Sequence, residues 1–129
     1  MLAIDTNVLV RYLTGDHPEQ SPKARALVDA HDIFVPLTVM LETEWVLRSA
    51  YGFAAVQVAT ALRAFAGLPH VTVEHPARLA QALHRAGNGM DFADALHLGG
   101  VEHCDALLTF DKRFIKAALA AGIDTVRAP

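Results

Sequence analysis

The sequence predicts an α/β fold in which helices flank a central, mostly parallel sheet of four to five strands. Short runs rich in Val, Ile and Leu alternate with longer amphipathic segments, as expected when helices cover buried parallel strands. The chain has 129 residues, of which 53% are hydrophobic, so it can bury one substantial core. We therefore expect a single domain of three layers that spans residues 1–129.

Five segments have the length and composition of strands. They are Leu2–Asp5, Ile33–Val35, Val71–Glu74, Ala106–Phe110 and Thr125–Arg127. A parallel sheet with crossover helices binds its ligands beyond the carboxyl ends of the strands. Residues that directly follow these segments are therefore the first candidates for a functional site.

The segments between the strands have the apolar spacing and the end signals of helices. The expected helices run from Asp5 to Leu13, from Pro18 or Ser21 to Ala30, from Thr38 to Tyr51, from Ala54 to Ala66, from Pro76 to Ala86, from Asp91 onward, and from Asp111 to Gly122. Thr38, Asp91 and Asp111 are the expected N-caps, because short polar side chains accept hydrogen bonds from the first free N–H groups. Gly52 is an expected stop.

Charge and cysteine content narrow the class of protein. Cys104 is the only cysteine, and the first residues have a strand pattern instead of a signal peptide, which favours a reducing cytoplasm. Arg11, Arg48 and Arg63 are among the charges that interrupt every apolar stretch before it reaches the roughly 20 residues needed to cross a bilayer. The net charge of −3 argues mildly against a nucleic-acid partner. Divalent ions bound to acidic residues would, however, reverse the charge locally.

Two aspartates directly follow apolar strand segments. Asp5 ends one such segment and precedes Thr6 and Asn7, whereas Asp111 ends another. Each can be an ordinary residue of a strand-to-helix turn. In that case Thr6 or Asn7 caps the helix that follows Asp5, and Asp111 caps the last helix. Each also stands where a parallel sheet binds ligands. Thr109 lies two residues before Asp111 and can support a carboxylate or a water by hydrogen bonding.

Two further acids lie on expected helices. Glu42 has no cationic partner at helical spacing, whereas Glu44 can form a solvated ion pair with Arg48. A carboxylate on a mostly apolar helix face needs compensation, either from a metal ion or from water at the rim of the protein. Asp94 lies one turn inside the helix that Asp91 can cap, where the helix dipole favours a negative charge. It can be a ligand, or it can merely support the helix terminus.

The four acids together predict a site of hard oxygen ligands that suits Mg²⁺ or Mn²⁺ and not Zn²⁺. They are Asp5, Glu42, Asp94 and Asp111. Negative charges about 4 Å apart repel by roughly 4 kcal/mol per pair at an effective dielectric near 20, so the cluster needs a cation. One or two metal ions would orient a water for attack on phosphorus and stabilise the leaving oxygen. We therefore expect hydrolysis at phosphorus without a side-chain nucleophile.

Four segments carry a family resemblance when they are taken in order. They are LAIDTNVLV at 2–10, LETEWVLRSAYG at 41–52, DFADALHL at 91–98 and LLTFDKRF at 107–114. Each is weak alone, but together they span almost the whole chain and are highly specific. The sequence resembles the PIN-domain nucleases, and in particular the VapC-like toxins of bacterial toxin-antitoxin modules.

This resemblance implies a function and a set of partners. The four acids would be the catalytic residues and metal ligands, and Asn7 and Thr109 would support them. The activity would be Mg²⁺- or Mn²⁺-dependent endonucleolytic cleavage of single-stranded RNA, often within structured RNAs such as transfer RNA. The protein would form a homodimer. A cognate antitoxin would bind the groove and push a basic or bulky residue toward the acids.

Several basic and aromatic side chains near the expected active edge have two interpretations. Four of them could hold RNA phosphates or be ordinary solvated charges: Arg11, Lys112, Arg113 and Lys116. His97 could touch metal or RNA, although packing within the protein is the favoured interpretation. Trp45 is expected in the core or in a dimer contact and not as a platform for base stacking, because its helix surface continues with apolar residues.

Two other functions are compatible with parts of the pattern. A phosphatase with an aspartyl nucleophile also begins with an aspartate after the first strand, but it generally has a second acid two residues later, where this chain has Asn7. A PIN-like scaffold could also bind RNA or a protein without cutting. The complete set of four acids disfavours this second alternative.

Overall fold

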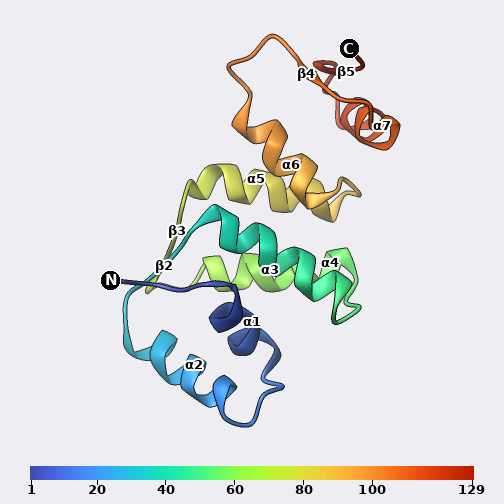
Figure 1. The fold of residues 1–129 in the computed structure, drawn as a ribbon. Helices are drawn as coiled ribbons and strands as arrows, with labels where there is room; N and C mark the ends of the chain where they lie inside the picture. Colours follow the sequence, from blue (N-terminus) through green and yellow to red (C-terminus); the bar gives the residue numbers. More distant parts are fainter.

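The computed structural model describes all 129 residues as seven helices and five short strands (Figure 1). In chain order they are β1 (Leu2–Ala3), α1 (Thr6–Thr14), α2 (Gln20–Ala30), β2 (Ile33–Val35), α3 (Leu37–Ser49), α4 (Ala55–Ala66), β3 (Val71–Val73), α5 (Pro76–Gly87), α6 (Phe92–Gly100), β4 (Leu107–Leu108), α7 (Lys112–Ala120) and β5 (Val126–Arg127). The α/β class and the order of the elements agree with the sequence prediction. None of the helices combines the length and apolar character that crossing a membrane requires.

Strands β1, β2 and β3 form one parallel sheet with β2 in the centre. Side chains alternate between the two faces of the sheet. Ile33 and Val35 lie on one face and are fully buried in the core. On the other face Phe34 is half-buried and Thr72 is exposed. The sheet is therefore well packed on one side and more open on the other.

Strands β4 and β5 form a second, separate parallel pair, connected by α7. We call β4, α7 and β5 together the C-terminal unit. In Figure 1 this unit stands apart from β1, β2 and β3, with α5 and α6 between them. The prediction of one sheet with four to five strands is thus wrong, because the strands divide into three and two.

The division has a physical cause in the packing of α7. Phe114, Ala118 and Val126 of the C-terminal unit are buried in the same contiguous core cluster as the rest of the molecule. Phe114 and Met90, which lies in the turn between α5 and α6, line the same pocket. The apolar side chains of the unit are thus buried in the common core, and β4 pairs with β5 and not with β1.

The helix ends confirm some of the predicted caps. Asp91 accepts a hydrogen bond from the Asp94 N–H at 3.2 Å, and Asp111 caps α7. In the first helix Asp5 itself is the cap, not Thr6 or Asn7, and it accepts from the Val8 N–H at 3.4 Å. Short acceptor side chains satisfy N–H groups that a helix cannot bond internally.

The cap of α3 differs from the prediction. Thr38 lies inside the helix, and Pro36 occupies the N-cap position, where it makes no side-chain hydrogen bond. Glu74, which follows β3, instead accepts from the Leu37 N–H at 2.9 Å. This acceptor is 37 residues away along the chain, so no local pattern indicates it. The bond joins the start of α3 to the carboxyl end of β3.

We expect Glu74→Ala to lower the free energy of unfolding by about 1 kcal/mol, because it leaves the first N–H of α3 without its acceptor. Chemical denaturation followed by circular dichroism would measure the change. Glu19→Ala is the matched control, since Glu19 is the N-cap residue of α2 and makes no side-chain cap bond. An equal loss in both variants would contradict the role of Glu74.

Candidate functional site

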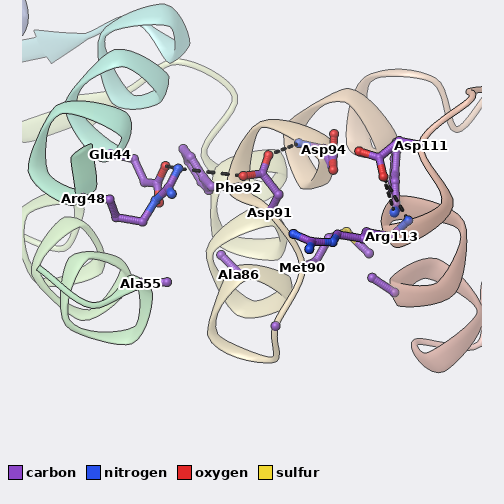
Figure 2. A pocket seen from close by; sticks show the side chains of 13 residues that line it. Glu44, Arg48, Ala55, Ala86, Met90, Asp91, Phe92, Asp94, Asp111 and Arg113 are labelled. Atoms are coloured by element: carbon purple, nitrogen blue, oxygen red, sulfur yellow. Dashed lines mark hydrogen bonds and ion pairs between the residues drawn. The ribbon is translucent and has the colours of Figure 1, made fainter. Parts of the chain in front are cut away.

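Two of the predicted acids meet in one pocket between α6 and α7. Asp94 lies in the first turn of α6 and Asp111 is the N-cap of α7, and both line a pocket of about 540 Å³. Figure 2 shows their carboxylates turned toward each other. Arg113 and Phe114 from α7 line the same pocket. We call the two carboxylates the Asp94–Asp111 pair.

The charge of Asp94 is disfavoured by its surroundings. Partial burial raises the pKa of Asp94, and the negative charges of Asp91 and Asp111 raise it further. The charge of His97 acts in the opposite direction. The pocket is therefore a place where negative charge has accumulated and where a cation would be stabilised.

Asp111 is held by the backbone around it. Its Oδ1 accepts hydrogen bonds from the N–H groups of Arg113 at 2.9 Å and Phe114 at 3.2 Å. The Thr109 hydroxyl accepts from the Asp111 N–H at 3.0 Å, so Thr109 holds the backbone and not the carboxylate. Because one oxygen is used in capping, the other is available to face the pocket, as Figure 2 shows.

An ion pair between the buried Glu44 and the half-buried Arg48 forms another wall of the pocket. Glu44 is only 3% exposed, and Arg48 Nη2 donates to its Oε1 at 3.0 Å. The same guanidinium lies 3.7 Å from Asp91, so it connects α3 to the start of α6 (Figure 2). The hydrogen bond with Glu44 raises the pKa of Arg48 above its usual value. The fixed cation helps to hold Asp91, which caps the helix that carries Asp94.

The predicted ion pair between Glu44 and Arg48 is confirmed, but Glu44 is buried and not solvated. Met40, Glu44 and Leu47 are spaced as i, i+4 and i+7, and all three are buried. This spacing places them on one face of α3, which packs inward. The same pattern in the sequence could have identified Glu44 as a buried acid. The contact of its partner Arg48 with Asp91 is non-local and carries no sequence signal.

The other two predicted acids do not reach the Asp94–Asp111 pair within one chain. Asp5 and Glu42 are exposed, and neither lines the pocket. No group of three or more His, Cys, Asp or Glu side chains lies close enough together to hold a metal ion. Mg²⁺ is often bound through only one or two carboxylates and several waters, so the pair fits part of such a site. The complete set of four acids remains a prediction.

Asn7 and Arg11 lie at a different pocket from the acids. This pocket of about 360 Å³ is also lined by Gln20 and Lys23. Arg11 donates to Gln20 at 2.9 Å, and to Asp16 and Tyr51 at 3.2 Å each. These bonds join α1 to the end of α3, which gives Arg11 a structural role. Its contact with RNA and the support of the acids by Asn7 stay predictions.

Asp16 is the acceptor at the centre of this network. Hydrogen bonds from Thr14 and Tyr51 lower the pKa of Asp16 to about 2, and Arg11 contributes in the same direction. Arg11 is thus held in place by an ionised carboxylate at any pH near neutrality.

The three other basic candidates lie on α7, whose N-cap Asp111 lines the acidic pocket. Lys112, Arg113 and Lys116 are exposed on α7. Arg113 lines the pocket with the acids, and it also lines an adjoining pocket with Lys116. These positions are compatible with phosphate binding, which stays a prediction for all three residues.

Packing predictions for two residues meet different outcomes. His97 is exposed, so its predicted packing within the protein is wrong, and its charge lowers the pKa of Asp94. Trp45 is 59% exposed, so the core alternative is wrong for it, whereas a dimer contact stays a prediction. Both residues lie on helix faces that no other part of this chain covers.

Comparison with known proteins gives one match. The family model described as PIN domain matches residues 2–119, which is most of the chain. No curated protein and no solved structure matches it.

We expect Asp94→Asn to raise the melting temperature in the absence of divalent ions. The folded state raises the pKa of this carboxyl, so ionised Asp94 destabilises the fold at neutral pH. The gain should be at most about 1 kcal/mol, because the group is partly solvated, and it should vanish below the unfolded pKa, where both variants are neutral. Asp29→Asn, at an exposed site on α2, is the control. A lower melting temperature for Asp94→Asn at neutral pH would contradict the role of charge repulsion.

Proposed function

The chain belongs to the PIN-domain family, whose members are generally nucleases, and from this premise we propose that it is a metal-dependent endoribonuclease. The observation that carries the proposal is the Asp94–Asp111 pair, which lines an open pocket next to the exposed Arg113. Two acids at the starts of two helices form an anionic site that a divalent cation would complete.

The donor atoms suit a hard cation. PIN domains typically use divalent metal ions, and carboxylate oxygen is the ligand that Mg²⁺ and Mn²⁺ prefer. In this proposal Asp94 and the free oxygen of Asp111 hold the ion, and Asp5 and Glu42 complete the site. A bound ion would activate a water and stabilise the leaving oxygen of a phosphodiester. Arg113 and Lys116 would position the substrate through its phosphates.

The narrower proposal concerns the biological role. We propose that the protein is the toxin of a toxin-antitoxin pair, acting in the cytoplasm on single-stranded RNA or on structured RNA such as transfer RNA. A cognate antitoxin would silence it by binding over the acids. Support comes from the four sequence segments that resemble VapC-like toxins.

One observation favours a second candidate, a PIN module that binds RNA or protein without cutting. A single chain brings only two of the four acids together, and no cluster of three metal-binding side chains exists within it. Such a module would show neither metal-dependent cleavage nor stabilisation by divalent ions.

We expect purified protein to cleave a single-stranded RNA oligonucleotide when Mg²⁺ or Mn²⁺ is present, and to be inactive in EDTA. Asp94→Asn and Asp5→Asn should each reduce the rate by roughly 100-fold or more, since even the partners of metal ligands commonly matter at that level. Asp29→Asn should cleave like the parent. Equal cleavage by the parent and by both site variants would indicate a contaminating nuclease and would contradict the assigned site.

A second expectation does not require the correct RNA substrate. Mn²⁺ or Mg²⁺ should raise the melting temperature of the parent in a concentration-dependent way, because an ion that binds only the folded state stabilises it by mass action. Asp94→Asn should lose this rise, although its melting temperature in EDTA is higher. The absence of any metal-dependent rise in the parent would favour the module that binds without cutting.

A further inference from the structure

Strand β1 has one edge that no other strand covers. It lies at the end of the three-stranded sheet and pairs only with β2. The N–H groups of Leu2 and Ile4 donate toward β2, to the carbonyls of Asp32 at 2.8 Å and Phe34 at 3.2 Å. Backbone groups of successive residues point to opposite sides of a strand. Ala3 therefore turns its N–H and C=O toward the open edge.

Strand β4 has an open edge of the same kind. It pairs only with β5, and the N–H groups of Leu107 and Thr109 donate toward that strand, at 2.9 and 3.0 Å. The alternate residues Leu108 and Phe110 therefore direct their backbone groups outward. Their side chains are 57% and 87% exposed. An exposed apolar strand edge is a template for pairing with another strand.

The chain as a whole exposes more surface than its mass predicts. Its accessible surface is 7569 Å² for a mass of 13.9 kDa. A compact monomer of this mass exposes roughly 6,700 Å². The excess of about 900 Å² is close to the roughly 800 Å² that each partner buries in an interface of standard size.

We propose that two copies of this chain exchange their open edges, so that β1 of each copy pairs in parallel with β4 of the other. The result is two five-stranded sheets, each with the order β3-β2-β1 from one copy followed by β4-β5 from the other. The association is two-fold symmetric and closed, because each copy offers the same two edges and both are used.

The backbone pattern selects a register for this pairing. In a parallel pair, the N–H and C=O of one residue bond to the two residues that flank the position directly opposite. Because Leu108 and Phe110 direct their backbone groups outward, Ala3 must lie opposite Thr109, which stands between them, or opposite Leu107. Asp5 and Asp111 each follow their strand as a helix cap. Placing these two caps at the same level puts Ala3 opposite Thr109. In that register the exposed Leu2 lies opposite the exposed Leu108.

A second copy fits these edges better than the chain's own C-terminal unit does. Within one chain, β4 could reach β1 only if the unit left its present position. Phe114 is 4% exposed there and lines a pocket with Met90, and Ala118 and Val126 are also buried. Closure within the chain would have to break this packing first. Pairing between copies leaves all of it in place.

The exchange would also complete the acidic site, a consequence that rests on the proposed function. Asp5 of one copy would reach the same sheet edge as Asp111 of the other, because the carboxyl ends of parallel strands meet there. Asp94 accompanies Asp111 in the pair described above. Each site would then take Asp5 and Glu42 from one copy, and Asp94 and Asp111 from its partner.

The first test does not depend on activity. In a Cys104→Ser background, which removes the only cysteine, Leu2→Cys and Leu108→Cys are combined in one chain and oxidised. Neighbouring strands separate their Cα atoms by about 5 Å, which a disulfide can span. We expect a covalent dimer on a non-reducing gel, and a similar dimer when the two single variants are mixed. A disulfide within one chain, or thiols that stay free, would overturn the exchange.

Solution mass gives a matched comparison. We expect the parent to be a dimer by light scattering. The Leu108→Lys dimer should dissociate into monomers at a protein concentration at least tenfold higher than the parent dimer does, because the substitution places a charge in the paired edge. Leu119→Lys should remain a dimer. Leu119 belongs to the same unit and is also 57% exposed, but it lies on α7. A monomeric parent, or equal dissociation of the two variants, would overturn the proposal.

Complementation tests whether the site is shared. Asp5→Asn and Asp111→Asn are each expected to be inactive alone. When the two variants are unfolded and refolded together, half of the dimers should contain one copy of each variant, and each such dimer would carry one intact site of its two. The mixture should therefore regain about a quarter of the parent RNA cleavage. Asp94→Asn mixed with Asp111→Asn should regain nothing. No regain from the first mixture, with an active parent, would overturn the shared site. An inactive parent would instead contradict the proposed function, and the disulfide and mass measurements would still decide the exchange.

Discussion

The burial of Phe114, Ala118 and Val126 in the common core is the packing on which the arrangement of this molecule depends. It joins the C-terminal unit to the rest of the chain, and in this position the N-cap of α7 and the first turn of α6 line one pocket. Asp111 and Asp94 meet for this reason. In the same position β4 does not pair with β1, and both strands keep open edges. The placement of the C-terminal unit by its buried apolar side chains therefore accounts both for the acidic pocket and for the division of the sheet.

The acidic pocket is tolerated because helix ends offset part of its repulsion. Asp91 and Asp111 are N-caps, where free N–H groups and the helix dipole favour a negative charge. Arg48 adds a fixed positive charge beside Asp91. Asp94 makes no such cap, and it is the carboxyl whose pKa is raised. The repulsion between the clustered carboxylates thus acts mainly on Asp94, whose ionised form a bound cation would also stabilise most.

Prediction from sequence succeeded where the physical cause is local. Asp91 and Asp111 were identifiable as caps because an N-cap bonds to N–H groups two or three residues ahead. It failed where the cause is distant in the chain. Glu74 caps α3 from 37 residues away, and the burial of Glu44 with Arg48 depends on what packs over that face of α3. The core position expected as one alternative for Trp45 fails for the converse reason, since nothing in the chain covers that side chain.

The sequence by itself determined the α/β class, the order of the helices and strands, and the four acids that make the chain a candidate nuclease. Periodicity and capping specify these features, and both act over a few residues. Only the tertiary structure decided which strands pair and which acids meet. The pairing of β1 with β4 would join residues about a hundred positions apart. Whether it occurs depends on where the apolar face of α7 finds its partner, which is a property of the assembled core and not of any segment.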